Sequence, residues 1–260
     1  MSIIAPVRSG PLAQLNPVAK LGAALVVSVV LLISIDWVSA AVALAAELLL
    51  LCFSGLPART VLLRTAPIWI AAPLAGITTV LYGRTSGTVY VHWVFVEISD
   101  GSIALGVATA LRILAIGLPA VIVFITIDPT DLADGLAQVL RLPARFVLGG
   151  LAGLRLVGLF VDDWRALTLA RRARGVAESG AVRRMLGQAF ALFVLSIRRG
   201  SKLATAMEAR GFGAPVARTW ARPSLFRARD WAALGVAVLV GGSAAGIAIA
   251  VGSWNVIVGS

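Results

Sequence analysis

The sequence predicts an all-α, polytopic membrane protein, a helical bundle of about five spans with a cytoplasmic domain of long amphipathic helices. Three observations carry this prediction. Of the 260 residues, 59% are hydrophobic and 13% are charged, against averages of about 45–50% and about 25% in soluble domains. Apolar runs recur at roughly the length that crosses a bilayer. The excess positive charge gathers in one block, and the mean hydropathy of +0.95 excludes a disordered chain.

The basic block limits the classes of partner. Residues 141–230 hold 17 Lys and Arg against 5 Asp and Glu, whereas the rest of the chain holds 6 against 7. Nucleic acid, anionic lipid and a cytoplasmic protein compete as partners. The block keeps long apolar runs and lacks a nucleic-acid-binding motif, so we expect no nucleic acid and favour the cytoplasmic surface of the membrane, with lipid as a partner. A single cysteine, Cys52, and a single histidine, His92, argue against disulfide and metal frameworks.

Five apolar runs predict the membrane spans. The first starts at Asn16-Pro17, because Asn suits the N-cap and Pro the first helical position. Glu47 lies within the second run and Arg112 within the fourth, and two prolines, Pro67 and Pro73, predict an irregular start to the third. The polar segment 83–100 is expected to be an external loop with a short hairpin or a re-entrant piece. The predicted spans cover residues 17–35, 38–53, 66–82, 102–127 and 231–251.

The distribution of Lys and Arg predicts the orientation. With the N-terminus inside, all 17 basic residues of the block are cytoplasmic and only Arg84 lies outside, as the positive-inside rule requires. The chain then divides into a membrane bundle of about four spans (1–127), a cytoplasmic or interfacial domain (128–230) and a C-terminal span (231–260). Within the middle segment we expect helices over 131–140, 144–174 and 182–210. The uncharged stretch 185–197 is too short for a span and suits an interfacial or buried helix.

A repeat marks the candidate functional site. Residues 170–176 and 206–212 share the pattern Ala-x-x-Ala-Arg-Gly followed by an apolar residue, 36 residues apart, each at the predicted end of a helix. Glycine can take the left-handed conformation that ends a helix, and arginine there offers five fixed donors to carboxylates or carbonyls of a partner. An ordinary Arg-Gly helix stop would explain one copy, but two copies indicate two docking elements. The candidate docking residues are Ala173, Arg174, Gly175, Ala209, Arg210 and Gly211.

With these motifs the chain resembles the transmembrane T component of energy-coupling-factor (ECF) transporters, ABC importers for vitamins and metal ions. The resemblance also rests on Leu15-Asn16-Pro17-x-x-Lys20 and on the run from Thr126 to Leu132. It implies a bacterial multi-pass cell-membrane protein whose two motifs dock on two ABC ATPase subunits and whose coupling helices carry a small substrate-binding S component. It implies no cofactor and no catalysis in this chain, since ATP and Mg²⁺ belong to the ATPases. The first motif departs from the second, with Arg171-Arg172 in place of Met207-Glu208.

Two alternatives remain from the residues alone: a self-sufficient secondary carrier and a polytopic membrane enzyme. Glu47 and Arg112 are costly in lipid and should pair with each other or face the bundle, where a proton relay is the functional alternative. No phosphate-binding loop of the GxxxxGK[ST] type occurs, so we expect no ATP hydrolysis by the chain itself. The titratable candidates for chemistry form no convincing acid–base or metal set, and the aspartates suit helix starts: Glu47, His92, Arg112, Asp128, Asp131 and Asp134.

Overall fold

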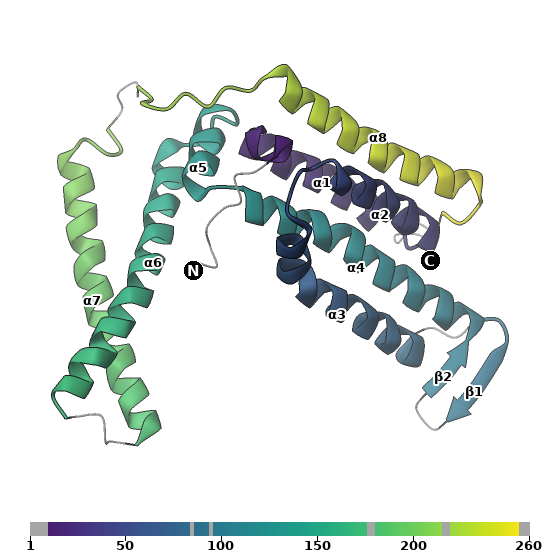
Figure 1. Ribbon diagram of the computed structural model, residues 1–260, viewed down its shortest axis with the longest axis horizontal. Helices are drawn as coiled ribbons and strands as arrows, with labels where there is room; N and C mark the ends of the chain where they lie inside the picture. The colour runs from purple at the N-terminus through teal and green to yellow at the C-terminus, as the bar shows by residue number, and fades with distance from the viewer. Residues whose placement is uncertain (1–9, 84–85, 94–95, 176–179, 215–218, 255–260) are drawn as a thin grey trace. The chain divides into compact units, whose positions relative to one another are not determined.

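The computed structural model describes residues 10–83, 86–93, 96–175, 180–214 and 219–254 (Figure 1). The chain forms two compact units. The first comprises the described residues up to Gly135 together with those from Ser224 on, and the second comprises Leu136–Pro223. Helix α8, predicted as a separate C-terminal segment, packs against α1 and α2 within the first unit. Two residues of the predictions, Arg84 and Val176, lie outside the described residues.

The first unit is a helical bundle with one hairpin. The short 3-10 helix η1 (Pro11–Gln14) precedes α1, and α5 leads from this unit into the second. Pairs of neighbours in the bundle include α3 with α4, α1 with α8 and α2 with α4. Its further elements are α1 (Pro17–Ile33), α2 (Trp37–Cys52), α3 (Ala58–Tyr82), β1 (Val89–Trp93), β2 (Val96–Ser99), α4 (Asp100–Thr126), α5 (Pro129–Gln138) and α8 (Ala228–Ala250).

The described residues include four helices long and apolar enough to cross a membrane, α3, α4, α8 and α6 (Ala144–Ala173). Three of them correspond to predicted spans. Helices α1 and α2 are apolar but have only 17 and 16 residues, because the backbone is extended at Ser34, the C-cap of α1, and Asp36 then caps α2. The sequence predicts α6 to be amphipathic and cytoplasmic; its first half is apolar apart from Arg145 and Arg155, so it meets the length and composition of a span.

The predicted irregular start of the third span is wrong. Helix α3 is continuous through Pro67 and Pro73 and begins at Ala58, so Arg59 and Arg64 lie inside it rather than before it. A proline removes one backbone donor from a helix, and packed neighbours and hydroxyl side chains can satisfy the freed groups. Near Pro67, Thr65 donates to the carbonyl of Val61 at 2.8 Å and accepts from the Trp69 indole at 3.2 Å, so side-chain bonds join the turns on either side of the proline.

The hairpin expected between the third and fourth spans is confirmed. Strands β1 and β2 pair antiparallel, with Trp93 opposite Val96 and His92 opposite Glu97. Figure 1 shows them at the end of α3 where α4 begins. There Ser99 and Ser102 cap α4 reciprocally through backbone-to-hydroxyl bonds of 2.9 and 3.2 Å. The hairpin therefore marks one end of the bundle.

Small residues bring the bundle helices together. Ala43, Ala115 and Ala244 are fully buried at the centre of the apolar core, beside Leu31. Close approach is tightest between α3 and α4, where a Cβ on Gly76 would meet the Gly106 carbonyl oxygen at 2.9 Å. Packing by small residues is the usual way membrane helices associate, because apolar side chains gain little by leaving lipid.

A polar cluster, which we call the clasp, joins the opposite end of the bundle. The buried Asp230 carboxylate accepts from the backbone N–H of Asn16 at 2.7 Å and of Arg227 at 2.8 Å. The Asn16 side chain accepts from Val18 N–H, as predicted for an N-cap, and its amide donates to Ser224 Oγ at 2.9 Å.

Lys20 extends the clasp to α4. Its ammonium, 5% exposed, donates to the Thr126 carbonyl at 3.2 Å. The start of α1, the end of α4 and the start of α8 are thus fastened at one end of the bundle.

The second unit is a pair of long helices, α6 and α7 (Ala181–Ala209). The predicted bounds, 144–174 and 182–210, agree with these helices to within one residue. Small residues in the first half of α6 would permit close approach of another helix, but no described residue uses them. A Cβ on any of its glycines would meet nothing within 4 Å: Gly149, Gly150, Gly153 and Gly158.

We expect Gly76→Val to destabilise the bundle, because the added side chain has no room against the Gly106 carbonyl. Overpacking of this kind costs about 1–3 kcal/mol. Gly246→Ala in α8 is the matched control, since a Cβ there meets nothing within 4 Å. Thermal unfolding of the purified chain in detergent measures both variants; equal unfolding temperatures would contradict the close approach.

Asp230→Ala should destabilise the chain by leaving the buried backbone N–H of Asn16 and the part-buried N–H of Arg227 without an acceptor. Each unsatisfied group costs about 1–3 kcal/mol. The neighbouring Arg229→Ala removes an exposed bond of 3.0 Å to Gln14 and should change little. Unfolding in detergent separates the two, and an equally mild effect of Asp230→Ala would argue against the clasp as a fixed joint.

Candidate functional site

The first candidate docking element is the C-terminal end of α6. Arg174 is its C-cap residue, and Gly175 follows with a φ of 69°, the left-handed conformation predicted from the sequence. The Gly175 N–H donates to the Arg172 carbonyl at 3.1 Å, and the Arg174 N–H donates to the Ala170 carbonyl at 3.2 Å. The glycine thus ends the helix without strain, because it has no Cβ.

The second element ends α7 in the same way. Gly211 has a φ of 75°, and its N–H donates to the Glu208 carbonyl at 2.9 Å. The Phe212 N–H donates to the Met207 carbonyl at 3.0 Å, which completes a Schellman motif. Phe212 thus closes the end of α7 through its backbone, and the left-handed glycine predicted from the repeat is present at both helix ends.

Both ends are open to contact. All six candidate docking residues are exposed. In the parts of the chain that the structure describes, neither the Arg174 nor the Arg210 guanidinium has a hydrogen-bond or ion-pair partner. Two guanidinium groups, each with five donors in a fixed plane, are therefore presented to whatever binds these helix ends.

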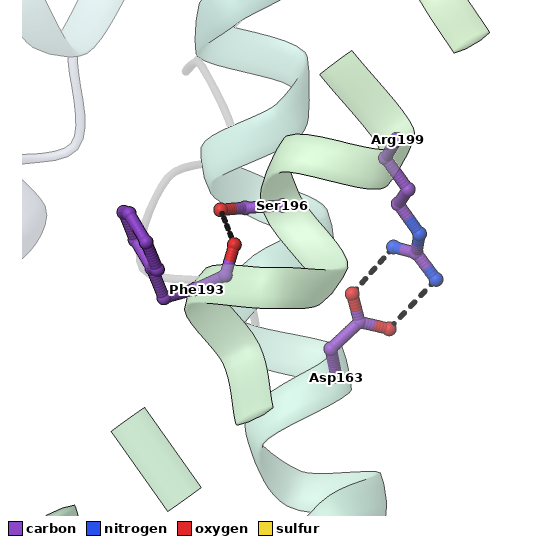
Figure 2. A network of polar contacts seen from close by, with 4 residues as sticks. All are labelled: Asp163, Phe193, Ser196 and Arg199. Atoms are coloured by element: carbon purple, nitrogen blue, oxygen red, sulfur yellow. Dashed lines mark hydrogen bonds and ion pairs between the residues drawn. The ribbon is translucent and has the colours of Figure 1, made fainter. Parts of the chain in front are cut away.

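An ion pair holds α6 and α7 together. The Arg199 guanidinium binds both carboxylate oxygens of Asp163, with Nη2 at 2.9 Å from Oδ1 (Figure 2). Toward the end of α6, the buried Gln188 side chain donates to Thr168 Oγ1 at 3.1 Å. Bidentate pairing fixes the register of the two helices as well as their contact.

The contacts also show that the two helices run antiparallel. Position 163 of α6 pairs with position 199 of α7, position 168 with 188, and position 171 with 184 and 187. The first helix end thus lies beside the start of α7, whereas the second lies at the far end of α7. At 1.5 Å per residue, the 26 residues from Arg184 to Arg210 separate the two ends by roughly 40 Å along the helix axis.

The face of α7 away from α6 is apolar and exposed. Its residues recur every three or four positions, the helical period, and lie opposite the buried Gln188. We call this surface the outer face of α7; it comprises Val182, Leu186, Phe190, Phe193 and Ile197, each 54–73% exposed.

The ion pair considered between Glu47 and Arg112 is not formed. Both carboxylate oxygens of Glu47 and the Nε and Nη2 atoms of Arg112 are buried without a partner. Glu47 lines an apolar groove of about 510 Å³ together with Leu118 of α4. Arg112 lies six residues before Leu118, about 9 Å away along the helix, so the register of α2 and α4 keeps the two charges apart.

The remaining candidates for chemistry fill structural roles or form no site. Asp128 accepts from the Thr130 N–H at 2.8 Å, and Asp131 lies in the first turn of α5, as helix-start residues do. Asp134 lies further along α5, and His92 lies in β1. No group of three or more His, Cys, Asp or Glu residues that could hold a metal occurs in the described ranges.

Sequence reasoning did not identify the Asp163–Arg199 pair, the hydrogen bonds from Arg171 to the α7 carbonyls of Arg184 and Gly187, or the clasp. A signal existed for the first: Asp162 and Asp163 supply two of the five acidic residues in the basic block. The sequence could not show which of them faces the neighbouring helix.

The fold and the paired helix ends define the class: a polytopic, all-α membrane protein that carries two exposed Arg-Gly helix ends on one helical hairpin. Residues 8–219 match the model of the CbiQ family, described as cobalt transport protein.

Several curated relatives are named energy-coupling factor transporter transmembrane protein EcfT. That of Lacticaseibacillus paracasei is 30% identical over 242 residues, covering 88% of this chain and 91% of the relative. That of Limosilactobacillus fermentum is 32% identical over 168 residues, covering 60% and 63%. That of Acidaminococcus fermentans is 28% identical over 219 residues, covering 79% and 81%.

The chain belongs to this family and is a T component of an ECF transporter, a membrane subunit that works with other subunits. The resemblance inferred from the motifs is confirmed. Membership places the chain among membrane transport proteins rather than among enzymes.

Asp163→Ala should loosen the contact between α6 and α7, because it leaves the Arg199 guanidinium without its bidentate partner. Hydrogen bonds to charged groups contribute about 1.5–3 kcal/mol. The adjacent Asp162→Ala is the matched control: that carboxylate is 74% exposed and lies 4.0 Å from Arg165. Hydrogen exchange of the α7 amides measures the effect, and identical exchange in the two variants would contradict a contact held by this pair.

Proposed function

We propose that this T component couples ATP hydrolysis by two cytoplasmic ABC ATPase subunits to the movement of a small substrate-binding S component. The observation that carries the proposal is the pair of Arg-Gly helix ends, both exposed and both with an unpaired guanidinium among the described residues. Each end docks in a socket of one ATPase, and Ala173, Gly175, Ala209 and Gly211 provide the small surroundings that let the arginine enter.

The separation of the ends supports two sockets rather than one. The two helix ends lie roughly 40 Å apart along the helix axis, which is too far for one pocket of a partner to hold both arginines. Because the ends belong to antiparallel helices joined by the Asp163–Arg199 pair, a change in the spacing of the two ATPases acts on both helices at once. This is a physical route from closure of the ATPases to motion of α6 and α7.

The charge distribution supports a cytoplasmic location for the N-terminus and for the pair of helices α6 and α7. Residues 136–223 hold 15 Lys and Arg and 4 Asp and Glu, a net charge of +11, which equals the net charge of the whole chain. In the first unit, the clasp gathers the start of α1, the end of α4 and the start of α8 at one end of the bundle, opposite the β1–β2 hairpin. We place the clasp end on the cytoplasmic side of a bacterial cell membrane and the β1–β2 hairpin on the outer side.

The outer face of α7 is the proposed platform for the S component. Its five large apolar side chains are exposed, and patches of this kind mark surfaces for proteins or membranes. The S component binds the transported vitamin or metal ion, and ATP and Mg²⁺ are bound by the ATPases, since the chain lacks a phosphate-binding loop. Displacement of α7 then reorients or releases the S component.

We expect the combined substitutions Arg174→Glu and Arg210→Glu to abolish association with the ATPases while the chain remains in the membrane. The reason is that acidic side chains cannot donate to the proposed sockets and meet like charge there. The measurement is affinity purification of the tagged chain from its native membrane, followed by mass spectrometry of what elutes with it.

Arg198→Glu combined with Lys202→Glu makes the matched control, because it changes the net charge equally at exposed positions of α7 away from both ends. The control should retain the ATPases. Recovery of intact wild-type chain without any ATPase would overturn the coupling function and favour a self-sufficient carrier.

A further inference from the structure

The groove that Glu47 lines lies wholly within the first unit, and small side chains create it. Helices α1, α2, α4 and α8 all contribute to its lining (Figure 1). Its volume of about 510 Å³ falls within the range of about 300–1,000 Å³ that is typical of small-molecule sites. The alanines that leave this space open come from α1 and α8: Ala23, Ala24, Ala232, Ala233 and Ala237.

The groove has the depth of one leaflet of a bilayer. Its lining on α8 runs from Arg229, at the clasp end, to Val240, near the middle of the helix, which is roughly 16 Å along the axis. The hydrocarbon core of a bilayer is about 30 Å thick, so one leaflet supplies about 15 Å. Trp231, two residues after Arg229, is 67% exposed, and tryptophan is enriched at membrane–water interfaces. The mouth of the groove therefore lies at the level of lipid headgroups.

This mouth is basic. The exposed Arg229 guanidinium donates from Nη1 to the Gln14 side-chain oxygen at 3.0 Å, a bond that uses one of its five donors and neither amide donor of Gln14. Lys20 adds a second cation to the lining. Asp230 is buried and accepts from backbone N–H groups, and among the described residues that line the groove Glu47 carries the only carboxyl. A headgroup with a net negative charge fits this mouth better than a zwitterionic one.

Glu47 supplies a polar group deeper in the groove. Both of its carboxyl oxygens are buried without a partner among the described residues. It lies five residues before Cys52, the end of α2, or roughly 8 Å along the helix, and Ser54 just beyond that end lines the groove with Pro11 of η1. In a glycerophospholipid the ester carbonyls lie just below the phosphate. A carboxyl group that holds a proton can donate to such an oxygen.

We propose that this groove is a binding site for one anionic glycerophospholipid of the surrounding leaflet. The phosphate binds Arg229 and the Gln14 amide, an ester carbonyl accepts from Glu47, and one acyl chain lies along the alanines of α1 and α8. The bound chain contacts α1, α4 and α8, the three helices that the clasp joins, so it supports that end of the bundle. The site does not depend on the proposed coupling function.

Native mass spectrometry of the purified full chain tests the proposal. The chain is delipidated in mild detergent and titrated with phosphatidylglycerol or with phosphatidylcholine of the same acyl chains. We expect one phosphatidylglycerol to bind about fivefold or more tighter than phosphatidylcholine, and Arg229→Ala to remove most of this preference. Equal affinities for the two lipids in the wild type would overturn the proposal.

A groove-filling variant provides the second readout. Ala233→Phe places a ring in the groove from α8 and should weaken phosphatidylglycerol binding by about tenfold or more. Ala250→Phe is the matched control, because it makes the same change at an exposed position of α8 outside the groove. Thermal unfolding in detergent checks that both variants fold. Equal binding by the two variants would indicate lipid spread around the whole bundle and would overturn the site.

An ether-linked phosphatidylglycerol, which lacks the ester carbonyls, tests the role of Glu47. The wild-type chain should bind the ester lipid about threefold or more tighter than the ether lipid, because only the ester accepts from the carboxyl. Glu47→Leu should bind the two lipids equally. Equal binding of both lipids by the wild type would overturn the contact with Glu47.

Purification of the tagged chain from its native membrane distinguishes a lipid from a protein occupant. Anionic phospholipid should be retained by the wild type and by Ala250→Phe and reduced in Ala233→Phe, with the same proteins eluting in all three. Loss of a membrane protein from Ala233→Phe, with the lipid unchanged, would show that the groove holds a protein segment. That outcome would overturn the lipid site and leave the proposed coupling function standing.

Discussion

The first unit depends on the buried Asp230 carboxylate and the bonds around Asn16. Each polar group of Asn16 is used: its N–H binds Asp230, its side-chain oxygen caps α1, its amide reaches Ser224 and Leu225, and its carbonyl accepts from the Lys20 N–H. A buried polar group left without a partner costs about 1–3 kcal/mol. The clasp therefore lets the start of α1, the end of α4 and the start of α8 lie together in an apolar bundle. It also fixes where the chain leaves the bundle after α4 and where it returns at α8.

The two units differ in what holds them. The bundle is filled by small, fully buried residues, and α3 and α4 touch at Gly76 and Gly106, so it resists deformation. Helices α6 and α7 rest on a few polar contacts around the Asp163–Arg199 pair, and their large apolar side chains are exposed. A helix pair with so little internal packing gains stability from partners on its free faces, which fits the proposed coupling role.

Much of the local structure could be read from the sequence. The Asn16-Pro17 and Asp128-Pro129 starts are N-caps with bonds of 3.0 and 2.8 Å, and the glycines of both repeats adopt the left-handed conformation. These features depend on residues within one or two turns of each other. The sequence did not predict the continuous path of α3 through two prolines, because packing of α3 against α4 matters more there than the propensity of proline.

The sequence by itself determined the class of protein, the bounds of the helices other than α3 to within a few residues, and the left-handed glycines of the two Arg-Gly ends. Only the tertiary structure decided that Asp163 rather than Asp162 meets Arg199, that Arg171 binds carbonyls of α7, and that Glu47 and Arg112 do not pair. The physical reason is register. Hydropathy and caps act along one helix, whereas the partner of a charge depends on how two helices slide and rotate against each other, which is settled by the packing of all their neighbours.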